Sequence, residues 1–170
     1  MPKTICPKCK NEISSKTTTC MYCGFNFKRW QLEAFSRDDN ASMRMIAAKS
    51  LDTPVPVLKS LSHDAEEDVR AKIADNPSTP TSVLGRLSGD TSEYVRSHVA
   101  DSARTPACVL EKLSKDDSAL VRSHIARNPH TPKCTLEKML RAGDPEVIER
   151  MMWNPRAPIS ALRAAIESVR

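Results

Sequence analysis

The feature that most constrains this chain is a 26-residue unit that recurs without insertion. Residues 64–89, 90–115 and 116–141 repeat one template, and the same template covers residues 38–63 and 142–167. The register is visible in two columns of equivalent residues: Met43, Val69, Val95, Val121 and Val147 in one, and Pro54, Pro80, Pro106, Pro132 and Pro158 in the other. A fixed period between roughly 20 and 50 residues predicts a solenoid, in which each unit buries its apolar face against its neighbours.

Each repeat is predicted to form two short helices, so the fold is expected to be mostly α-helical. In the first segment the apolar residues fall at helical intervals, as at Val69, Ile73 and Ala74, and in the second they include Val83 and Leu87. Helices of roughly eight to eleven residues are not stable alone in water. Stacking of the repeats is therefore expected to supply their stability.

Short polar motifs mark the expected ends of these helices. Asp64 and Glu67 have the spacing of a capping box, and Asp144 stands before a proline as an N-cap residue often does. The Asn-Pro step at 76–77 is expected to end the first helix of its repeat. The Thr-Pro step at 79–80 is expected to cap and restart the second helix.

The repeat reads D-x-x-x-x-V-R-x-x-V-A-x-N-P-x-T-P-x-x-V-L-x-x-L, and in this form it resembles the leucine-rich repeat variant family. That family is an α-solenoid related to HEAT and armadillo repeats, and the resemblance covers about three quarters of the chain. It implies a right-handed superhelix of paired helices and a bacterial source. It implies no activity, because the family has no shared catalytic residues, and function must be argued separately from fold.

Four of the six cysteines form two C-x-x-C pairs, Cys6 with Cys9 and Cys20 with Cys23. Two such knuckles are the pattern of a zinc ribbon, and four thiolates suit tetrahedral zinc. We expect residues 1–27 to hold one zinc ion in a structural role, because four protein ligands leave no position for a catalytic water. Iron, as a single ion or an iron–sulfur cluster, is the weaker alternative, since cluster sites more often group their cysteines unevenly.

Residues 28–37 are predicted to form a second helix without its partner, because Leu32 and Phe35 lie 26 residues before Leu58 and Leu61. This half repeat would cap the solenoid of residues 38–170, with the ribbon in place of the missing helix. Five of the seven aromatic residues lie between positions 22 and 35, and we interpret them as joining the ribbon to the solenoid.

An alternative interpretation of the same region is a nucleic-acid contact, in which aromatic side chains stack on bases beside basic residues. Residues 1–37 hold seven basic and two acidic residues, a net charge of +5, whereas the rest of the chain holds 19 of each sign. The neutral solenoid argues against a long nucleic-acid groove. The residues that would make the contact are Lys8, Lys10, Tyr22, Lys28, Arg29 and Trp30.

An arginine stands six residues after an aspartate in four consecutive repeats: Asp38 and Arg44, Asp64 and Arg70, Asp90 and Arg96, and Asp116 and Arg122. We interpret this column as an ion-pair ladder between adjacent repeats, because the last repeat has Ala142 and Ile148 and so loses both members together. The alternative is an arginine stripe that binds phosphate or an acidic peptide.

A second polar column contains Lys72, His98, His124 and Arg150. Equivalent positions of stacked helices lie roughly 8 to 10 Å apart, which is too far for one metal ion to join the two histidines. We therefore expect a surface stripe that contacts a partner, with a charge that depends on pH because histidine titrates near neutrality. The same spacing is too long for a disulfide between Cys108 and Cys134, and these are expected to be small buried or half-buried thiols.

The C-terminal edge departs from the earlier repeats. Met152 follows a column of alanines, and Trp153 follows a column of charged residues, Lys49, Asp75, Asp101 and Arg127. In one interpretation Met152 fills a gap and Trp153 folds over Ile148 and Ala157. In the other, Trp153 is a contact for a protein partner or for a second copy of the chain in a homodimer. The last apolar residues of the final repeat are Leu162, Ala165 and Ile166.

The sequence favours a non-enzymatic binding scaffold or adaptor with an unidentified protein partner. No phosphate-binding loop or nucleophile motif is present, and a membrane span would need a far longer apolar run. We expect a cytoplasmic protein, since the N-terminus lacks the apolar core of a signal peptide. A nucleic-acid-binding role through the ribbon is the alternative. A HEAT-like DNA glycosylase is a remote one, because the solenoid offers only Tyr94 and Trp153 as aromatic residues.

Overall fold

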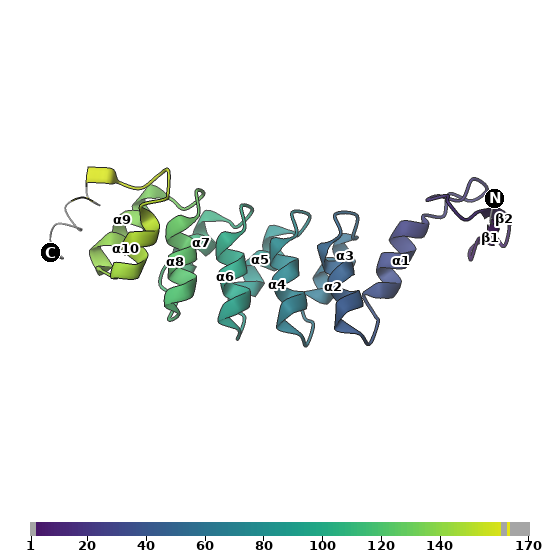
Figure 1. Ribbon diagram of the computed structural model, residues 1–170, viewed down its shortest axis with the longest axis horizontal. Coiled ribbons are helices and arrows are strands. Elements are labelled where there is room, and N and C mark those ends of the chain that lie inside the picture. Colours follow the sequence, from purple (N-terminus) through teal and green to yellow (C-terminus); the bar gives the residue numbers. More distant parts are fainter. Residues whose placement is uncertain (1–2, 161–162, 164–170) are drawn as a thin grey trace.

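The chain forms a row of paired helices with a small stranded unit at its N-terminal end (Figure 1). The computed structural model describes residues 3–160 and residue 163. The first helices of the repeats are α2 (Ala41–Lys49), α4 (Glu67–Asp75), α6 (Glu93–Asp101), α8 (Ala119–Arg127) and α10 (Pro145–Met151). The second helices are α3 (Val55–Leu61), α5 (Thr81–Leu87), α7 (Ala107–Leu113) and α9 (Lys133–Ala142). Leu162, Ala165 and Ile166 lie outside the described residues.

The first helices form the tighter of two rows. Consecutive first helices pack directly against one another, and the second helices α3, α5 and α7 each pack against the first helices on either side, while α9 packs against α10. Ile73 and Leu84 are completely buried, and one continuous apolar core runs from Leu32 to Met151. This arrangement confirms the predicted α-solenoid, in which contacts are made between neighbouring repeats.

The threonine of the Thr-Pro step closes the first helix, and the prediction that it caps the second helix is wrong. Thr79 Oγ1 donates to the carbonyl oxygen of Ile73 at 2.7 Å, and the N-cap of α5 is Pro80, which has no side-chain capping bond. The last carbonyls of a helix lack partners within the helix, so a buried hydroxyl there satisfies one of them. The same bond to the carbonyl six residues earlier is made by Thr53, Thr105 and Thr131.

The asparagine of the Asn-Pro step joins neighbouring repeats. Asn76 is buried, and its Nδ2 donates to the carbonyl oxygens of Ala48 at 2.6 Å and Ser50 at 3.0 Å, both in the preceding repeat. Its Oδ1 accepts from the amide of Ser78. A buried amide group with all these partners holds two repeats in register. Equivalent bonds reach back 28 residues from Asn128 and Asn154.

The expected capping box is also wrong, because the aspartate lies too far upstream. Helix α4 begins at Glu67 with Glu66 as N-cap, and Asp64 Oδ1 accepts from the amide of Glu66 at 3.0 Å. The aspartate therefore shapes the turn before the helix. The predicted cap at Asp144 is confirmed, since its side chain accepts from the amide of Val147 at the start of α10.

The N-terminal unit is a two-stranded hairpin followed by a helix. Strands β1 (Lys3–Ile5) and β2 (Glu12–Ser14) are antiparallel, with Thr4 opposite Ile13. Helix α1 (Phe27–Phe35) follows, and Asn26 caps it by accepting from the amide of Arg29. Leu32 of α1 belongs to the solenoid core, so α1 connects the two parts of the molecule.

Candidate metal centre and interaction surface

The four cysteines of the two knuckles come together at one point. Their sulfur atoms all lie within 4.8 Å of one another, and two pairs, Cys6 with Cys23 and Cys9 with Cys20, are separated by 3.7 Å. A tetrahedral ion with metal–sulfur bonds of about 2.3 Å would place its sulfurs about 3.8 Å apart. The four side chains therefore fit a metal ion.

The two knuckles share one backbone conformation. The amide of Lys10 donates to the carbonyl oxygen of Cys6, and the amide of Gly24 donates to that of Cys20, both at 2.9 Å. The donor residue is left-handed in each case, with φ of 62° at Lys10 and 69° at Gly24. Glycine adopts this conformation without strain, and Lys10 adopts it at a cost that the tight turn requires.

The thiols have unequal proton affinities in the absence of an ion. A hydrogen bond from the backbone amide of Asn11 is the main cause that lowers the pKa of Cys9 to about 6. Burial, with a smaller contribution from the neighbouring thiols, raises the pKa of Cys23 to about 12. Four thiolates at this spacing repel one another, so full ionisation of the set requires a cation among them.

The aromatic residues of this region divide into buried and exposed members. Phe25 and Phe27 pack against the cysteine cluster with their rings edge to face at 5.1 Å, and the Trp30 ring lies 6.2 Å from Phe25. The side chains of Tyr22 and Trp30 are 60% and 49% exposed. Phe35 packs against the solenoid core. Phe25 and Phe27 thus pack within the ribbon and Phe35 within the solenoid, so the expected joining role stays a prediction, while Tyr22 is exposed to solvent.

The basic residues predicted for nucleic-acid contact are all exposed, but two of them are engaged in ion pairs. Lys28 pairs with Asp52 of the first repeat, and Arg29 pairs with Glu33 on its own helix at 3.1 Å. Lys8 and Lys10 lie in and just after the first C-x-x-C pair, and Tyr22 lies in the second. Because the four cysteines meet at one point, these three exposed residues belong to the two loops that hold the cluster.

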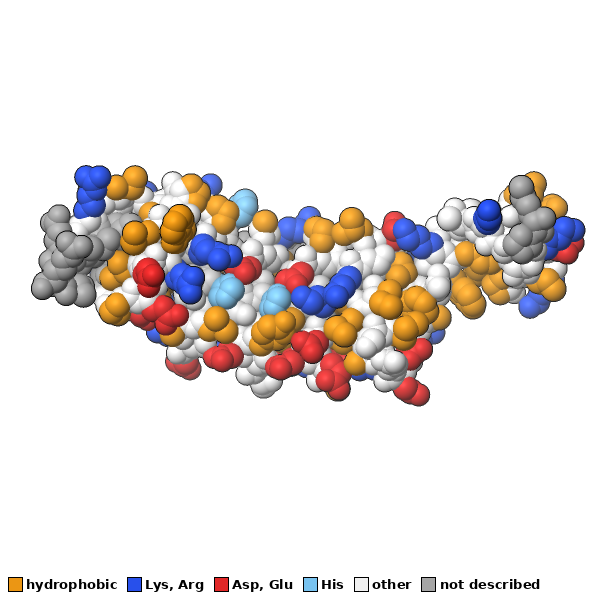
Figure 2. Space-filling model, viewed as in Figure 1, with side chains coloured by type: hydrophobic (Ala, Val, Ile, Leu, Met, Phe, Trp, Pro, Cys, Tyr) orange, Lys and Arg blue, Asp and Glu red, His pale blue; other side chains and the backbone are white. Residues whose placement is uncertain are grey.

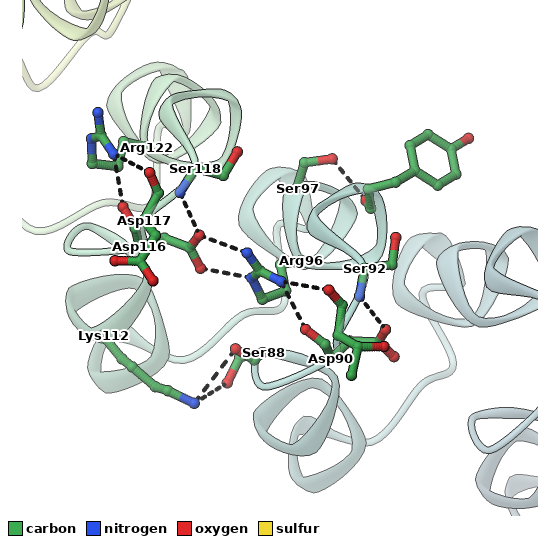
Figure 3. A network of polar contacts seen from close by, with 12 residues as sticks. Ser88, Asp90, Ser92, Arg96, Ser97, Lys112, Asp116, Asp117, Ser118 and Arg122 are labelled. Atoms are coloured by element: carbon green, nitrogen blue, oxygen red, sulfur yellow. Dashed lines mark hydrogen bonds and ion pairs between the residues drawn. The ribbon is translucent and has the colours of Figure 1, made fainter.

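The arginine column forms the predicted ladder. The Arg96 guanidinium donates to both oxygens of Asp116, at 2.8 and 2.9 Å, and also to the carbonyl oxygen of Asp90 at 2.8 Å (Figure 3). Each arginine is thus bonded to the turn of its own repeat and to the aspartate of the next. Arg44 with Asp64 and Arg70 with Asp90 repeat this geometry.

The ladder carboxylates are held in their ionised form. Burial alone would raise the pKa of Asp90, but hydrogen bonds from Arg70 and from the amide of Ser92 outweigh burial and lower it. The same opposition acts on Asp64 and Asp116, and the net effect is again a lowered pKa. Bidentate pairs between partly buried groups are the strong members of their class.

The last repeat was expected to lose both the aspartate and the arginine of the ladder, and this expectation is wrong because the last step keeps an acid. Arg122 donates to Asp144 Oδ2 at 2.6 Å, so Asp144 takes the role that Ala142 cannot fill. Helix α9 runs through position 142, and Gly143 ends it with φ of 73°. Helices α3, α5 and α7 each have a serine as C-cap, and the equivalent position in α9 is Leu140, which lies inside the helix. Because α9 is longer, the acid that pairs with Arg122 stands two residues later in its repeat.

The histidine column lies on the exposed side of the first helices and is paired between repeats. His98 Nδ1 lies 2.6 Å from Asp75 Oδ1, and His124 Nδ1 lies 2.8 Å from Asp101 Oδ2. The second contact does not have the geometry of a hydrogen bond. Figure 2 shows lysine, arginine and histidine side chains in a band across the middle of this side, with acidic side chains mostly below.

We name the exposed side of α2, α4, α6, α8 and α10 the first-helix face. This face also contains residues that the sequence pattern did not assign to a contact surface. They are the aspartates that pair with the histidines, Arg127, and the apolar side chains of Ile46, Tyr94 and Leu120, which are 49%, 38% and 42% exposed. Side chains three, four and seven residues apart lie on the same side of a helix, so this spacing within each first helix could have identified the face.

The repacking interpretation of the C-terminal edge is wrong. Met152 is 55% exposed and Trp153 is 77% exposed, so neither fills a gap. Met151 is completely buried and takes the apolar position next to the alanine column. Trp153 lies in solvent as its predecessors Lys49, Asp75, Asp101 and Arg127 do. Cys108 and Cys134 are likewise exposed, contrary to prediction, because the second residue of α7 and of α9 points away from the core.

The fold and the cysteine cluster define an α-solenoid with a four-cysteine unit at one end. The chain is similar to a solved leucine-rich repeat variant, described as having a novel repetitive structural motif, with a TM-score of 0.64 and 27% sequence identity. The match covers 82% of this chain and 55% of the other, so this chain spans about half the length of that protein. No family model and no curated protein matches the chain. None of the described helices has the length and apolar character that crossing a membrane requires.

Proposed function

We propose that this protein is a non-enzymatic cytoplasmic scaffold that binds a protein partner on its first-helix face. The observation that carries the proposal is the composition of that face. Exposed apolar side chains, including Tyr94, Leu120 and Trp153, lie there beside Lys72, His98, His124 and Arg150. Aromatic residues and arginine are favoured at the centres of protein interfaces, where a few of them account for most of the binding free energy.

The proposed role of the cysteine cluster is structural, with zinc as the ion. Four sulfur ligands at tetrahedral spacing are typical of structural zinc and leave no open coordination position. The unit would then form a folded end for the helix row. Elemental analysis of the purified chain should give one zinc per molecule, and iron or a coloured protein would contradict this assignment.

A matched pair of variants tests the scaffold proposal. Leu120→Glu changes the first-helix face, and Leu51→Glu makes the same change at a side chain that is 65% exposed in the loop after α2. We expect a pull-down from the native host to lose its captured protein with Leu120→Glu and to keep it with Leu51→Glu. Circular dichroism should show the same helical content for both variants. Equal capture by both variants would contradict the proposal.

Nucleic-acid binding through the ribbon is the second candidate, supported by the exposed Tyr22 beside Lys8 and Lys10. Phosphate contacts release counterions, so such binding weakens steeply as salt rises. A shift assay with generic DNA and RNA between low and physiological salt separates the two candidates. A steep salt dependence that is removed by Lys8→Ala with Tyr22→Ala would favour the ribbon.

A further inference from the structure

The four steps between consecutive first helices differ in the charges that they bring together. At the α2–α4 step Lys72 lies 23 residues after Lys49, and Lys72 pairs with Asp75 of its own helix at 2.9 Å. At two steps a histidine reaches back 23 residues to an aspartate of the preceding repeat, His98 to Asp75 and His124 to Asp101. Each of these steps therefore places a cationic or neutral imidazole against a carboxylate. The carboxylate is held ionised at the first of them: burial would raise the pKa of Asp75, but hydrogen bonds from His98 and Lys72 lower it.

The step between α8 and α10 differs from the two steps before it. Arg150 lies 23 residues after Arg127, so two arginines occupy the positions where those two steps hold a histidine and an aspartate. Neither arginine has a hydrogen bond or an ion pair with any described residue, whereas the other arginines of α4, α6 and α8 are bonded. Lys72 at the first step is also bonded, so among the described residues of these columns the two arginines stand out by their lack of a bonded acid.

Both arginines line a hollow of about 250 Å³ on the first-helix face, together with Leu120, Ser123, His124 and Glu146. Glu146 is the one acidic residue among these described lining residues, so the hollow has an excess of positive charge. Trp153 continues the column of Arg127 on the next turn of the solenoid and is exposed. The hollow is thus a basic recess with the exposed Leu120 in its lining.

We propose that this recess binds the carboxylate of a glutamate or aspartate that stands among apolar residues of a partner protein, and that this carboxylate pairs with Arg127 and Arg150, which have no bonded acid among the described residues. A guanidinium pair recognises a carboxylate through charge-assisted, bidentate hydrogen bonds. Leu120 in the lining selects an apolar neighbour of that acid. Asp75 and Asp101 lie on the same face, and they repel the continuous phosphates of a nucleic acid. This inference rests on the proposed function and names the anchor of that same surface.

The decisive variant is Arg127→Asp in the full chain, because it places an aspartate where Asp75 and Asp101 stand at the two preceding steps. Arg150 then faces an aspartate, as His98 and His124 do, and the free energy of unfolding should stay the same or rise. Arg104→Asp makes the same change of charge at an exposed residue in the loop between α6 and α7 and is the matched control. The probes are short fluorescein-labelled peptides with one glutamate between apolar residues, and matched peptides with glutamine.

We expect the wild type to bind a glutamate peptide, the glutamine peptide to bind at least about tenfold more weakly, and Arg127→Asp to weaken glutamate binding by a similar factor. Arg104→Asp should bind as the wild type does. Equal binding of both peptides, unchanged binding by Arg127→Asp, or no binding of any peptide by the wild type overturns the inference. Stronger competition by single-stranded DNA than by the glutamate peptide also overturns it. If the peptide experiment fails but the pull-down still loses its captured protein with Leu120→Glu, the scaffold proposal stands and only the carboxylate-binding recess is overturned.

Discussion

The N-terminal unit buries three side chains around its cysteine cluster, Cys6, Ile13 and Cys20, whereas the solenoid buries a core that runs from Leu32 to Met151. A unit with so small a core cannot offset its loss of conformational entropy by apolar burial, so we expect its folding to depend on a metal ion held by the four cysteines. The solenoid is instead expected to gain a similar contribution at each interface between neighbouring repeats. The two parts of the chain should therefore respond differently to the loss of a single residue.

Loss of one cysteine should affect the first unit most strongly. Cys23→Ser removes one of four ligands, and we expect residues 3–26 to lose their ordered structure while most of the helical signal remains. Backbone NMR spectra and circular dichroism measure the two parts separately. Loss of the whole helical signal would show that the helix row needs its N-terminal end.

Removal of one ladder arginine should lower the stability of the solenoid by a smaller amount. Arg96→Ala leaves the Asp116 carboxylate without its bidentate partner, and we expect a loss of about 1 to 3 kcal/mol in the free energy of unfolding. Denaturant unfolding measures this change. Arg104→Ala is the control and should stay within about 0.5 kcal/mol. A similar value for the two variants would mean that the ladder contributes little.

The ladder should also make the solenoid sensitive to acid. The pKa of Asp64, Asp90 and Asp116 is lowered from 3.8, so their stabilisation is fully present above that value and is lost as pH falls through the lowered pKa. Unfolding free energies should therefore be nearly constant near neutrality and decrease below about pH 4. Asp90→Asn should be less stable at neutral pH and lose less stability in acid. An unchanged acid slope in this variant would assign the effect to other groups.

The smallest expected effect on stability is at the C-terminal edge. Because Trp153 is 77% exposed, Trp153→Ala should change the free energy of unfolding by less than about 0.5 kcal/mol. The same change should weaken partner capture, or self-association measured by light scattering over a concentration series. A stability loss well above that value would mean that the ring packs within the fold.

Local patterns in the sequence were sufficient to predict much of this architecture. The 26-residue period and the spacing of Val69 and Ile73 predict stacked helix pairs, and the two C-x-x-C pairs predict a four-sulfur cluster. These features are local or strictly periodic, so each can be identified without knowing how one repeat sits on the next. The arginine column could be assigned to a ladder for the same reason.

The partners of individual side chains were decided by the tertiary structure. Arg96 pairs with Asp116 twenty residues later, and Asn76 bonds to Ala48 twenty-eight residues earlier. These offsets depend on how far each repeat shifts and turns relative to its neighbour, which the packing of the core sets and a repeat pattern does not encode.

The tertiary structure also decided which side chains face solvent at the C-terminal end of the helix row. The sequence places Met151 and Met152 side by side, and only the path of α10 after Pro145 buries the first and exposes the second. The sequence contains Arg127 and Arg150 but does not show that they lie near each other. It is the stacking of α8 on α10 that brings these two arginines to one hollow, because neighbouring repeats place residues 23 apart in contact.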